Sequence, residues 1–189
     1  KKAEAVFGQT PVSEQLVPLI EADKVVAYES NPILKKRVLG KDDVDIAAMI
    51  KKLGNSDWVR EGRAFYEENE LVCPFCQQST TEAFAHSLNE YFDETFVTDI
   101  KAIDDLLTNY TTDAARLQQQ IATVIATPSR FLDIEKLKTE KDLLDSKITI
   151  NRQRLDSKRK EPSQIVDLES ISNVVSTIKA LIDAANVLV

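Results

Sequence analysis

Apolar side chains recur at alternating intervals of three and four residues over much of this chain. One stripe runs from Phe84 to Val124, a second from Phe131 to Leu155, and a third from Leu168 to Val189. This spacing places the apolar residues on one face of an α-helix and, sustained over several heptads, is typical of coiled coils. Because such a helix exposes its apolar face when alone in water, the three helices must pack on one another.

Prolines divide the three stripes. Thr127-Pro128 ends the first, because proline lacks the amide hydrogen and fits best at the first position of a new helix. Glu161-Pro162-Ser163 ends the second. The sequence therefore predicts an all-α fold with an antiparallel coiled-coil arm at residues 81–189, built from helices at about 81–126, 129–160 and 164–189. A polar Asn151 lies on the second stripe, where it would fix the register of packing.

Residues 1–80 are predicted to form a separate, mixed portion. Residues 1–40 contain three of the chain's 6 prolines and are expected to be irregular. After Gly40, Asp42 or Asp43 is expected to cap a helix that stops at Gly54 in a left-handed conformation. Ser56 or Asp57 would cap a second helix, and together the two helices form a helical root that ends at a cysteine turn.

That turn, Cys73-Pro74-Phe75-Cys76, holds the only 2 cysteines of the chain. Two thiols at this spacing bind one side of a zinc ion or act as a redox pair. A redox enzyme of the glutaredoxin type needs a strong strand before the first cysteine, and only Leu71-Val72 precedes it. Zinc binding and a metal-free helix corner are the two interpretations that remain open.

Structural zinc takes four ligands in a tetrahedron, so Cys73 and Cys76 supply only half of a site. Two copies of the chain that meet at their turns would provide four thiolates around a shared zinc ion. In the alternative, one chain adds His86, its sole histidine, and a carboxylate such as Glu90.

Charge is distributed unevenly along the predicted arm, although the whole chain has a formal net charge of -7. Residues 129–160 carry ten basic and six acidic side chains, whereas residues 81–110 carry seven acidic side chains and Lys101. Complementary helix faces that pair within a bundle explain this pattern. A nucleic-acid contact is the alternative, and its candidate residues are basic side chains near the end of the second helix: Lys147, Arg152, Arg154, Lys158, Arg159 and Lys160.

Several functional classes are not expected. The glycines do not fit a phosphate-binding P-loop, so no nucleotide site and no catalytic activity are predicted for these residues. No apolar run approaches the roughly 18 residues of a membrane span, and no signal peptide is recognised. We therefore expect an internal piece of a cytoplasmic protein.

Four short runs of the sequence resemble the middle region of bacterial AAA-type, SMC-like ABC ATPases, which include the RloC and PrrC-like anticodon nuclease ATPases and, more remotely, the zinc-hook repair ATPases. These runs are residues 31–34, 38–47, 57–62 and 73–78. In such proteins a coiled-coil arm is inserted between the two lobes of the ATPase head. The zinc hook of repair ATPases lies between two long arms, whereas Cys73 precedes the long helices here.

The resemblance implies that this chain is a non-catalytic arm and its root. Such an arm acts as a lever or assembly element that couples nucleotide-driven movement of the head lobes to a nucleic acid or a partner chain, which includes a second copy of itself. The alternative function is a self-contained nucleic-acid-binding helical module that uses the basic residues 147–160.

Overall fold

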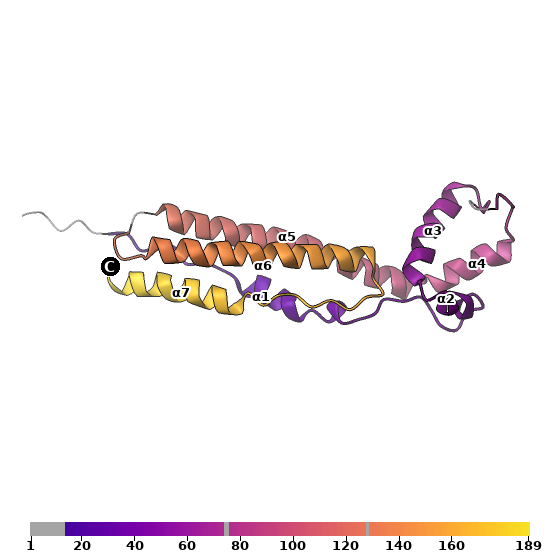
Figure 1. Cartoon of the computed structure of the whole chain (residues 1–189), viewed down its shortest axis with the longest axis horizontal. Coiled ribbons are helices and arrows are strands. Elements are labelled where there is room, and N and C mark those ends of the chain that lie inside the picture. The colour runs from indigo at the N-terminus through magenta and orange to yellow at the C-terminus, as the bar shows by residue number, and fades with distance from the viewer. Residues whose placement is uncertain (1–13, 74–75, 128) are drawn as a thin grey trace, which may run out of the picture. The chain divides into compact units, whose positions relative to one another are not determined.

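The computed structural model describes residues 14–73, 76–127 and 129–189, and within these ranges it is helical without a β-strand (Figure 1). The predicted all-α class is confirmed. None of the described helices is both long and apolar enough to cross a membrane. In chain order, the described helices are α1 (Asp23–Ala27), the 3-10 helices η1 (Tyr28–Ser30) and η2 (Pro32–Leu34), α2 (Ala47–Leu53), α3 (Ser56–Glu68), α4 (Glu82–Tyr91), α5 (Glu94–Ala126), α6 (Ile134–Lys160) and α7 (Ser172–Val187).

The chain forms two compact units that interleave along the sequence. Unit 1 contains Lys1–Val26, Asp113–Ile148 and Ser170–Val189, and unit 2 contains Ala27–Thr112 and Thr149–Glu169. Helices α5 and α6 therefore each contribute one half to either unit. This division differs from the boundary after residue 80 that the sequence predicted.

Unit 1 consists of the second half of α5, the first half of α6, and α7, which lie side by side (Figure 1). The predicted stripes supply its core, because these side chains are buried: Ala114, Leu117, Ile121, Val124, Leu137, Leu144, Ile148, Val175, Ile178, Ile182 and Ala185. An extended segment at residues 14–22 packs onto the same helices. Its Val17 is buried and exchanges two backbone hydrogen bonds with the side-chain amide of Asn186 on α7.

Unit 2 contains α2, α3, α4, the first half of α5 and the second half of α6. Aromatic side chains form much of its core at the α4–α5 junction, where the Phe92 ring packs edge-on against both Tyr91 and Phe96, each 4.8 Å away between centroids. Gly40 lies directly against the Tyr91 ring, since a Cβ atom at this glycine would stand 2.2 Å from Cε1 of Tyr91. Only a residue without a side chain permits this approach.

The single helix expected at residues 81–126 is two helices, α4 and α5. Thr81 caps α4 by accepting a hydrogen bond from the Phe84 amide, as the run of hydroxyl residues before it indicates. The helix ends at Tyr91, and Asp93 caps α5 by accepting a hydrogen bond from the Phe96 amide. The heptad pattern hides this break because Phe92 and Phe96 remain buried on both sides of it.

The third helix begins later than the sequence indicates. Residues 164–171 were expected to be helical, but α7 starts at Ser172 and residues 165–170 are extended. The Val166 amide donates to the Leu34 carbonyl, and the Val38 amide donates to the Pro162 carbonyl. Residues 34–38 and 162–166 therefore run antiparallel, and this pairing replaces helical hydrogen bonds.

The helical root is present with different N-terminal caps. Asn55, and not Ser56 or Asp57, caps α3 by accepting a hydrogen bond from the Trp58 amide. Neither Asp42 nor Asp43 caps α2, which begins at Ala47 without a side-chain cap. Gly54 ends α2 with φ 66° as predicted.

Candidate functional site

Helices α3 and α4 form a helical hairpin, which we call the cysteine hairpin, and the Cys73–Cys76 turn lies in the loop that joins them (Figure 1). The sequence predicted the turn before a long helix. Because of the break at Phe92, the helix that follows the cysteine turn is the short α4. The thiols therefore lie at the end of a hairpin of α3 and α4.

The chain reverses direction around the two cysteines. The Cys73 amide donates to the Gln78 carbonyl, and the Gln77 amide donates to the Cys73 carbonyl, both at 2.9 Å between nitrogen and oxygen. Val72 and Ser79 form an antiparallel bridge just below the turn. Gln77 closes the turn with φ 58°. Two backbone hydrogen bonds and the bridge therefore hold the cysteine positions, while Pro74 and Phe75 lie outside the described residues.

Cys73 and Cys76 are not joined in a disulfide, and their environments differ. Cys73 is half-buried and Cys76 is exposed. His86 and Glu90 lie on α4, where the Nδ1 atom of His86 is 3.3 Å from a Glu90 carboxylate oxygen and both side chains are exposed. Among the described residues, no group of three or more His, Cys, Asp or Glu side chains is placed to hold a metal ion. Two thiols would supply half of the ligands of a tetrahedral zinc site.

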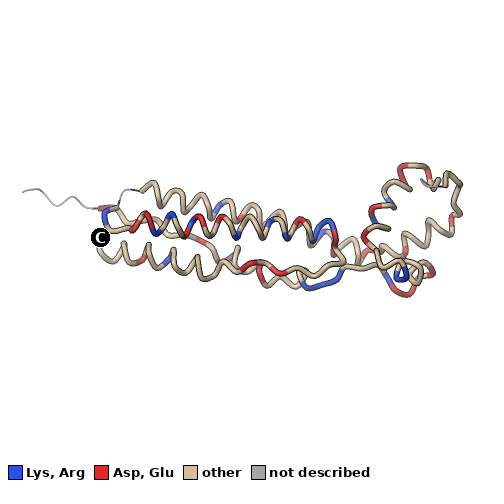
Figure 2. Tube along the Cα trace, viewed as in Figure 1, with Lys and Arg blue, Asp and Glu red and all other residues tan. Residues whose placement is uncertain are grey.

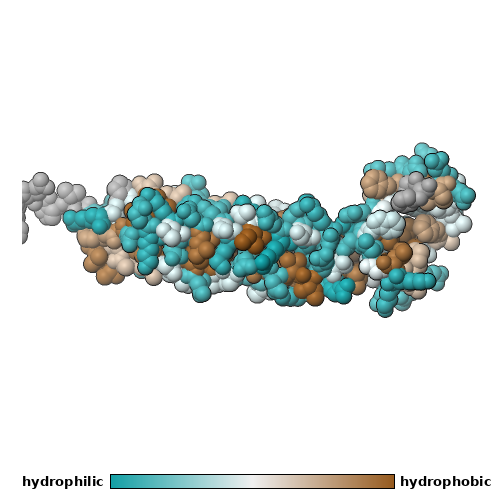
Figure 3. Space-filling model, viewed as in Figure 1, coloured by the Kyte–Doolittle hydropathy of each residue, from teal (hydrophilic) through white to brown (hydrophobic). Residues whose placement is uncertain are grey.

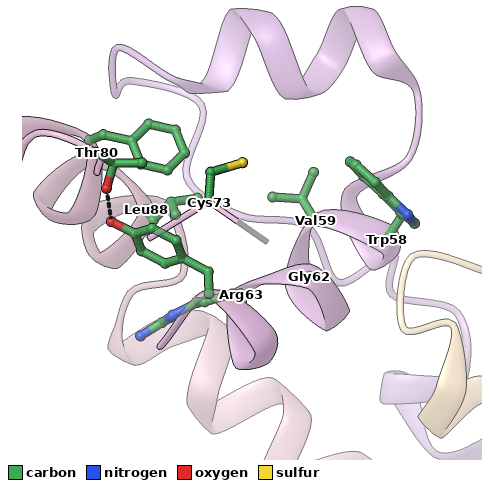
Figure 4. Close-up of a pocket in the computed structure, with 9 residues that line it drawn as sticks. Trp58, Val59, Gly62, Arg63, Cys73, Thr80 and Leu88 are labelled. Atoms are coloured by element: carbon green, nitrogen blue, oxygen red, sulfur yellow. Dashed lines mark hydrogen bonds between the residues drawn. The ribbon is translucent and has the colours of Figure 1, made fainter. Parts of the chain in front are cut away.

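An apolar pocket of about 210 Å³ lies between α3 and α4 of the cysteine hairpin (Figure 4). Its wall contains aromatic and aliphatic side chains together with one of the thiols: Trp58, Val59, Tyr66, Phe84, Leu88 and Cys73. In Figure 4 the sulfur of Cys73 points towards Val59. Figure 3 shows apolar atoms at the surface in the part of the molecule that contains α2, α3 and α4.

The pocket is held open by contacts at its edge. The Tyr66 hydroxyl is hydrogen-bonded to the Thr80 hydroxyl, and the Tyr66 ring packs edge-on against Phe84 at 5.6 Å between centroids. Arg63 donates to Glu67 at 2.6 Å and to Asn89 at 2.8 Å, so it links α3 to α4. A Cβ atom at Gly62 would have no other atom within 4 Å, so there is open space at this position on α3.

The basic residues on α6 make intramolecular contacts, and charges of both signs alternate along this helix (Figure 2). Arg159 and Lys160 both pair with Asp156, at 2.7 and 2.8 Å. Arg154 donates to the Asp167 carbonyl and to the Glu169 carboxylate, and Arg152 donates to the Thr111 carbonyl. Lys147 is half-buried on the same helix. A nucleic-acid contact by these residues stays a prediction.

Lys158 is the most deeply buried of these basic residues, with 1% of its surface exposed. Its ammonium group donates to three backbone carbonyls, those of Lys36, Pro162 and Gln164. Burial lowers the pKa of Lys158 from its usual value, although Asp57 and Asp99 partly offset the desolvation. A buried ammonium group that is already bonded to three carbonyls does not fit a direct contact with phosphate.

Asn151 joins Lys158 in holding the extended segment. Its side chain accepts from the Glu169 amide at 2.6 Å and donates to the Glu169 carbonyl at 2.9 Å, and it also donates to the Tyr110 hydroxyl. Asn151 on α6 therefore bonds both the backbone of this segment and the neighbouring helix α5. Lys158 follows Asn151 by seven residues. If the second stripe is continued past Leu155, its next position is therefore Lys158, and the burial of this lysine could have been predicted.

Sequence reasoning missed the pocket beside the thiols. Trp58, Val59, Gly62 and Tyr66 lie at helical spacing on one face of α3, which is a signal for a shared surface. The other wall of the pocket contains Phe84 and Leu88 on α4. It could not be predicted, because these residues are distant in sequence and the helix break at Phe92 was not recognised.

A comparison with protein-family models finds a match to the AAA domain family over residues 1–189. A search of curated proteins and a search of solved structures each returned no match. The family match spans the cysteine hairpin and both helical units, in agreement with the resemblance to AAA-type ATPases seen in the sequence. The chain therefore belongs to the AAA domain family.

Proposed function

We propose that this chain is a non-catalytic helical arm of a cytoplasmic, SMC-like AAA-type ATPase related to the RloC and PrrC-like enzymes. It acts as an assembly element and lever between the ATPase head lobes and a partner. The observation that carries the proposal is the cysteine hairpin, in which the loop between the two helices contains two cysteines that are not joined in a disulfide. A hairpin that carries a pair of metal-ligating groups at its end is suited to joining chains.

In this proposal the thiolates of Cys73 and Cys76 form half of a zinc site, and a second copy supplies the other half. Zinc would provide the cross-link, while the turn hydrogen bonds of Cys73, Gln77 and Gln78 hold the thiols in place. Residues 56–91 contain seven acidic and two basic side chains, a net charge of -5. Two such hairpins repel each other, so the association should depend on the divalent ion.

The test is to measure zinc content and molar mass in solution, with and without a chelator. We expect one zinc ion per two chains, and a dimer that becomes a monomer when zinc is removed. Cys73→Ser and Cys76→Ser should each abolish zinc binding and dimerisation together, because two of the four ligands are lost with either change.

His86→Ala is the matched control, because it removes the only histidine and leaves the thiols intact. It should keep both the metal and the dimer. Loss of zinc from a monomeric His86→Ala variant would instead assign the site to a single chain, with His86 as a ligand. A wild-type chain that stays a metal-free monomer in the presence of zinc would refute the shared zinc site.

A further inference from the structure

The cysteine hairpin contains a second feature, the apolar pocket. Of the residues that line this pocket, the proposed zinc site uses Cys73 alone. We propose that this pocket binds one large apolar side chain of a partner segment that is basic on either side of it. This inference does not depend on zinc or on dimerisation.

The first argument is the unfilled apolar space. Trp58 remains 50% exposed and Phe84 37% exposed at the pocket, although both are large apolar side chains. The position above Gly62 is open. Aromatic side chains around an apolar hollow resemble the pockets that receive anchor residues in protein interfaces, where tryptophan, tyrosine and arginine are enriched. The volume of about 210 Å³ accommodates a single side chain and not a helix.

The second argument is charge. Among the described residues that line the pocket, Arg63 is the one cation, and its pairing with Glu67 offsets its positive charge. Further carboxylates of the hairpin are exposed, among them Glu61, Glu68, Glu70 and Glu82. An apolar pocket within a hairpin of net charge -5 favours lysine or arginine on both sides of the anchor residue. The same charge disfavours a second copy of this hairpin as the occupant.

The chain provides its own reporter, because Trp58 is its only tryptophan and lines the pocket. The probe is the peptide Gly-Lys-Lys-Phe-Lys-Lys-Gly, titrated into the full chain with a chelator present so that zinc cannot contribute. We expect a saturable blue shift of Trp58 emission, since the phenylalanine would exclude water from the indole. Calorimetry should give the same affinity.

Two peptide controls separate the apolar and charged contributions. Replacing the phenylalanine by alanine should weaken binding about tenfold or more, because the anchor is lost. Replacing the four lysines by glutamates should abolish binding. If the alanine peptide binds equally well, the pocket is not the site, and if the glutamate peptide binds equally well, the charge argument is wrong. No change in Trp58 emission up to millimolar peptide overturns the proposal.

Variants of the protein test the same surface. Gly62→Leu fills the pocket and should weaken binding about tenfold, whereas Val187→Leu, a change at an exposed residue of α7, should have no effect. If Gly62→Leu loses helical structure by circular dichroism, Val59→Trp fills the pocket from the neighbouring position. Binding that survives in the folded pocket-filling variant contradicts the inference.

A charge-matched pair completes the design. Glu67→Gln with Glu70→Gln should weaken the peptide severalfold at low salt, while Glu140→Gln with Asp142→Asn in unit 1 changes the net charge equally and should have little effect. Equal losses in both double variants would show that binding is non-specific. None of these outcomes depends on zinc content. If the peptide does not bind, the proposal of a zinc site shared by Cys73 and Cys76 of two chains is unaffected, and if that zinc site is absent, the pocket proposal is unaffected.

Discussion

At the scale of single residues, Lys158 shows how a basic side chain on a heptad stripe can be part of a core. Its aliphatic stem is buried with the apolar seam of α6, and its ammonium group binds carbonyls from two separate segments of the chain. A positive charge in a sequence is ordinarily taken as an exposed one. Here the three carbonyls satisfy all three donors of the ammonium group, which is why burial is tolerated.

Lys158→Met should lower the free energy of unfolding by about 3 kcal/mol, since the three carbonyls lose their donor while the stem volume is kept. Urea denaturation would measure it. Lys136→Met, at an exposed position on the same helix, should change stability by less than about 0.5 kcal/mol. Equal effects of the two substitutions would contradict the role assigned to Lys158.

The pH dependence of stability carries a second signature of the same residue. Because burial lowers the pKa of Lys158, the unfolded chain binds more protons than the folded one between the folded pKa and about 10.4. Stability should therefore rise with pH in that alkaline window. Burial raises the pKa of Tyr110, so its contribution should be lost as pH rises above about 10.

Tyr110→Phe removes the loss of stability that Tyr110 causes above about pH 10, so the rise of stability with pH that is due to Lys158 should be easier to see. In Lys158→Met this rise of stability should be absent. Unfolding free energies measured between about pH 8 and 11 would decide this, and a rise that persists without Lys158 would assign it to another group.

At the scale of elements, the extended segment before α7 is held by side chains of α6 as well as by its backbone hydrogen bond to Leu34. Asn151 bonds both the amide and the carbonyl of Glu169, and Arg154 bonds the Asp167 carbonyl. In unit 1, Asn186 bonds Val17 in the same bidentate way. In each extended segment, a side-chain amide thus bonds both the N–H and the C=O of one residue, as a neighbouring strand would.

Asn151→Leu should release the segment around Glu169, because it leaves the Glu169 amide and carbonyl without their partner and removes a donor to Tyr110. We expect a loss of about 2 to 3 kcal/mol and faster hydrogen exchange at the Glu169 amide. Asn109→Leu, next to Tyr110 on an exposed face of α5, serves as the control. Unchanged exchange at Glu169 would contradict this account.

The same elements show what could be predicted from the sequence. The stripes identified most of the buried core because helical periodicity is a local property. The boundaries at residues 92 and 164 could not be predicted. The first depends on a cap by Asp93 within an unbroken apolar pattern, and the second depends on hydrogen bonds to residues 34–38, which are distant in sequence.

At the scale of the whole molecule, two functions compete. The basic residues of α6 would serve a nucleic-acid-binding module, and the cysteine hairpin would serve an assembly arm. Arg152, Arg154 and Lys158 bond groups within unit 2, whereas Arg159 and Lys160 are exposed and pair with the nearby Asp156 on their own helix. A clean test of nucleic-acid binding must therefore spare the first three residues, since their loss would disturb the fold.

We expect Arg159→Gln with Lys160→Gln to leave binding of duplex DNA and single-stranded RNA unchanged, measured between 50 and 200 mM salt. If these residues contacted phosphates, the slope of log affinity against log salt would fall by about 1 for each residue removed. A loss of that size would favour the nucleic-acid-binding module over the assembly arm. Lys136→Gln with Lys138→Gln, on the same helix, is the control for a general effect of charge.

The interleaving of the two units has a consequence for how the molecule is made. During synthesis, the cysteine hairpin is complete once Tyr91 has emerged, but unit 2 lacks its segment Thr149–Glu169 and unit 1 lacks Ser170–Val189 until much later. Contacts between segments so far apart in sequence form slowly. A ribosome-bound intermediate would therefore expose the apolar seams of α5 and α6 while presenting a finished hairpin, so its partner could bind before the rest of the chain has folded.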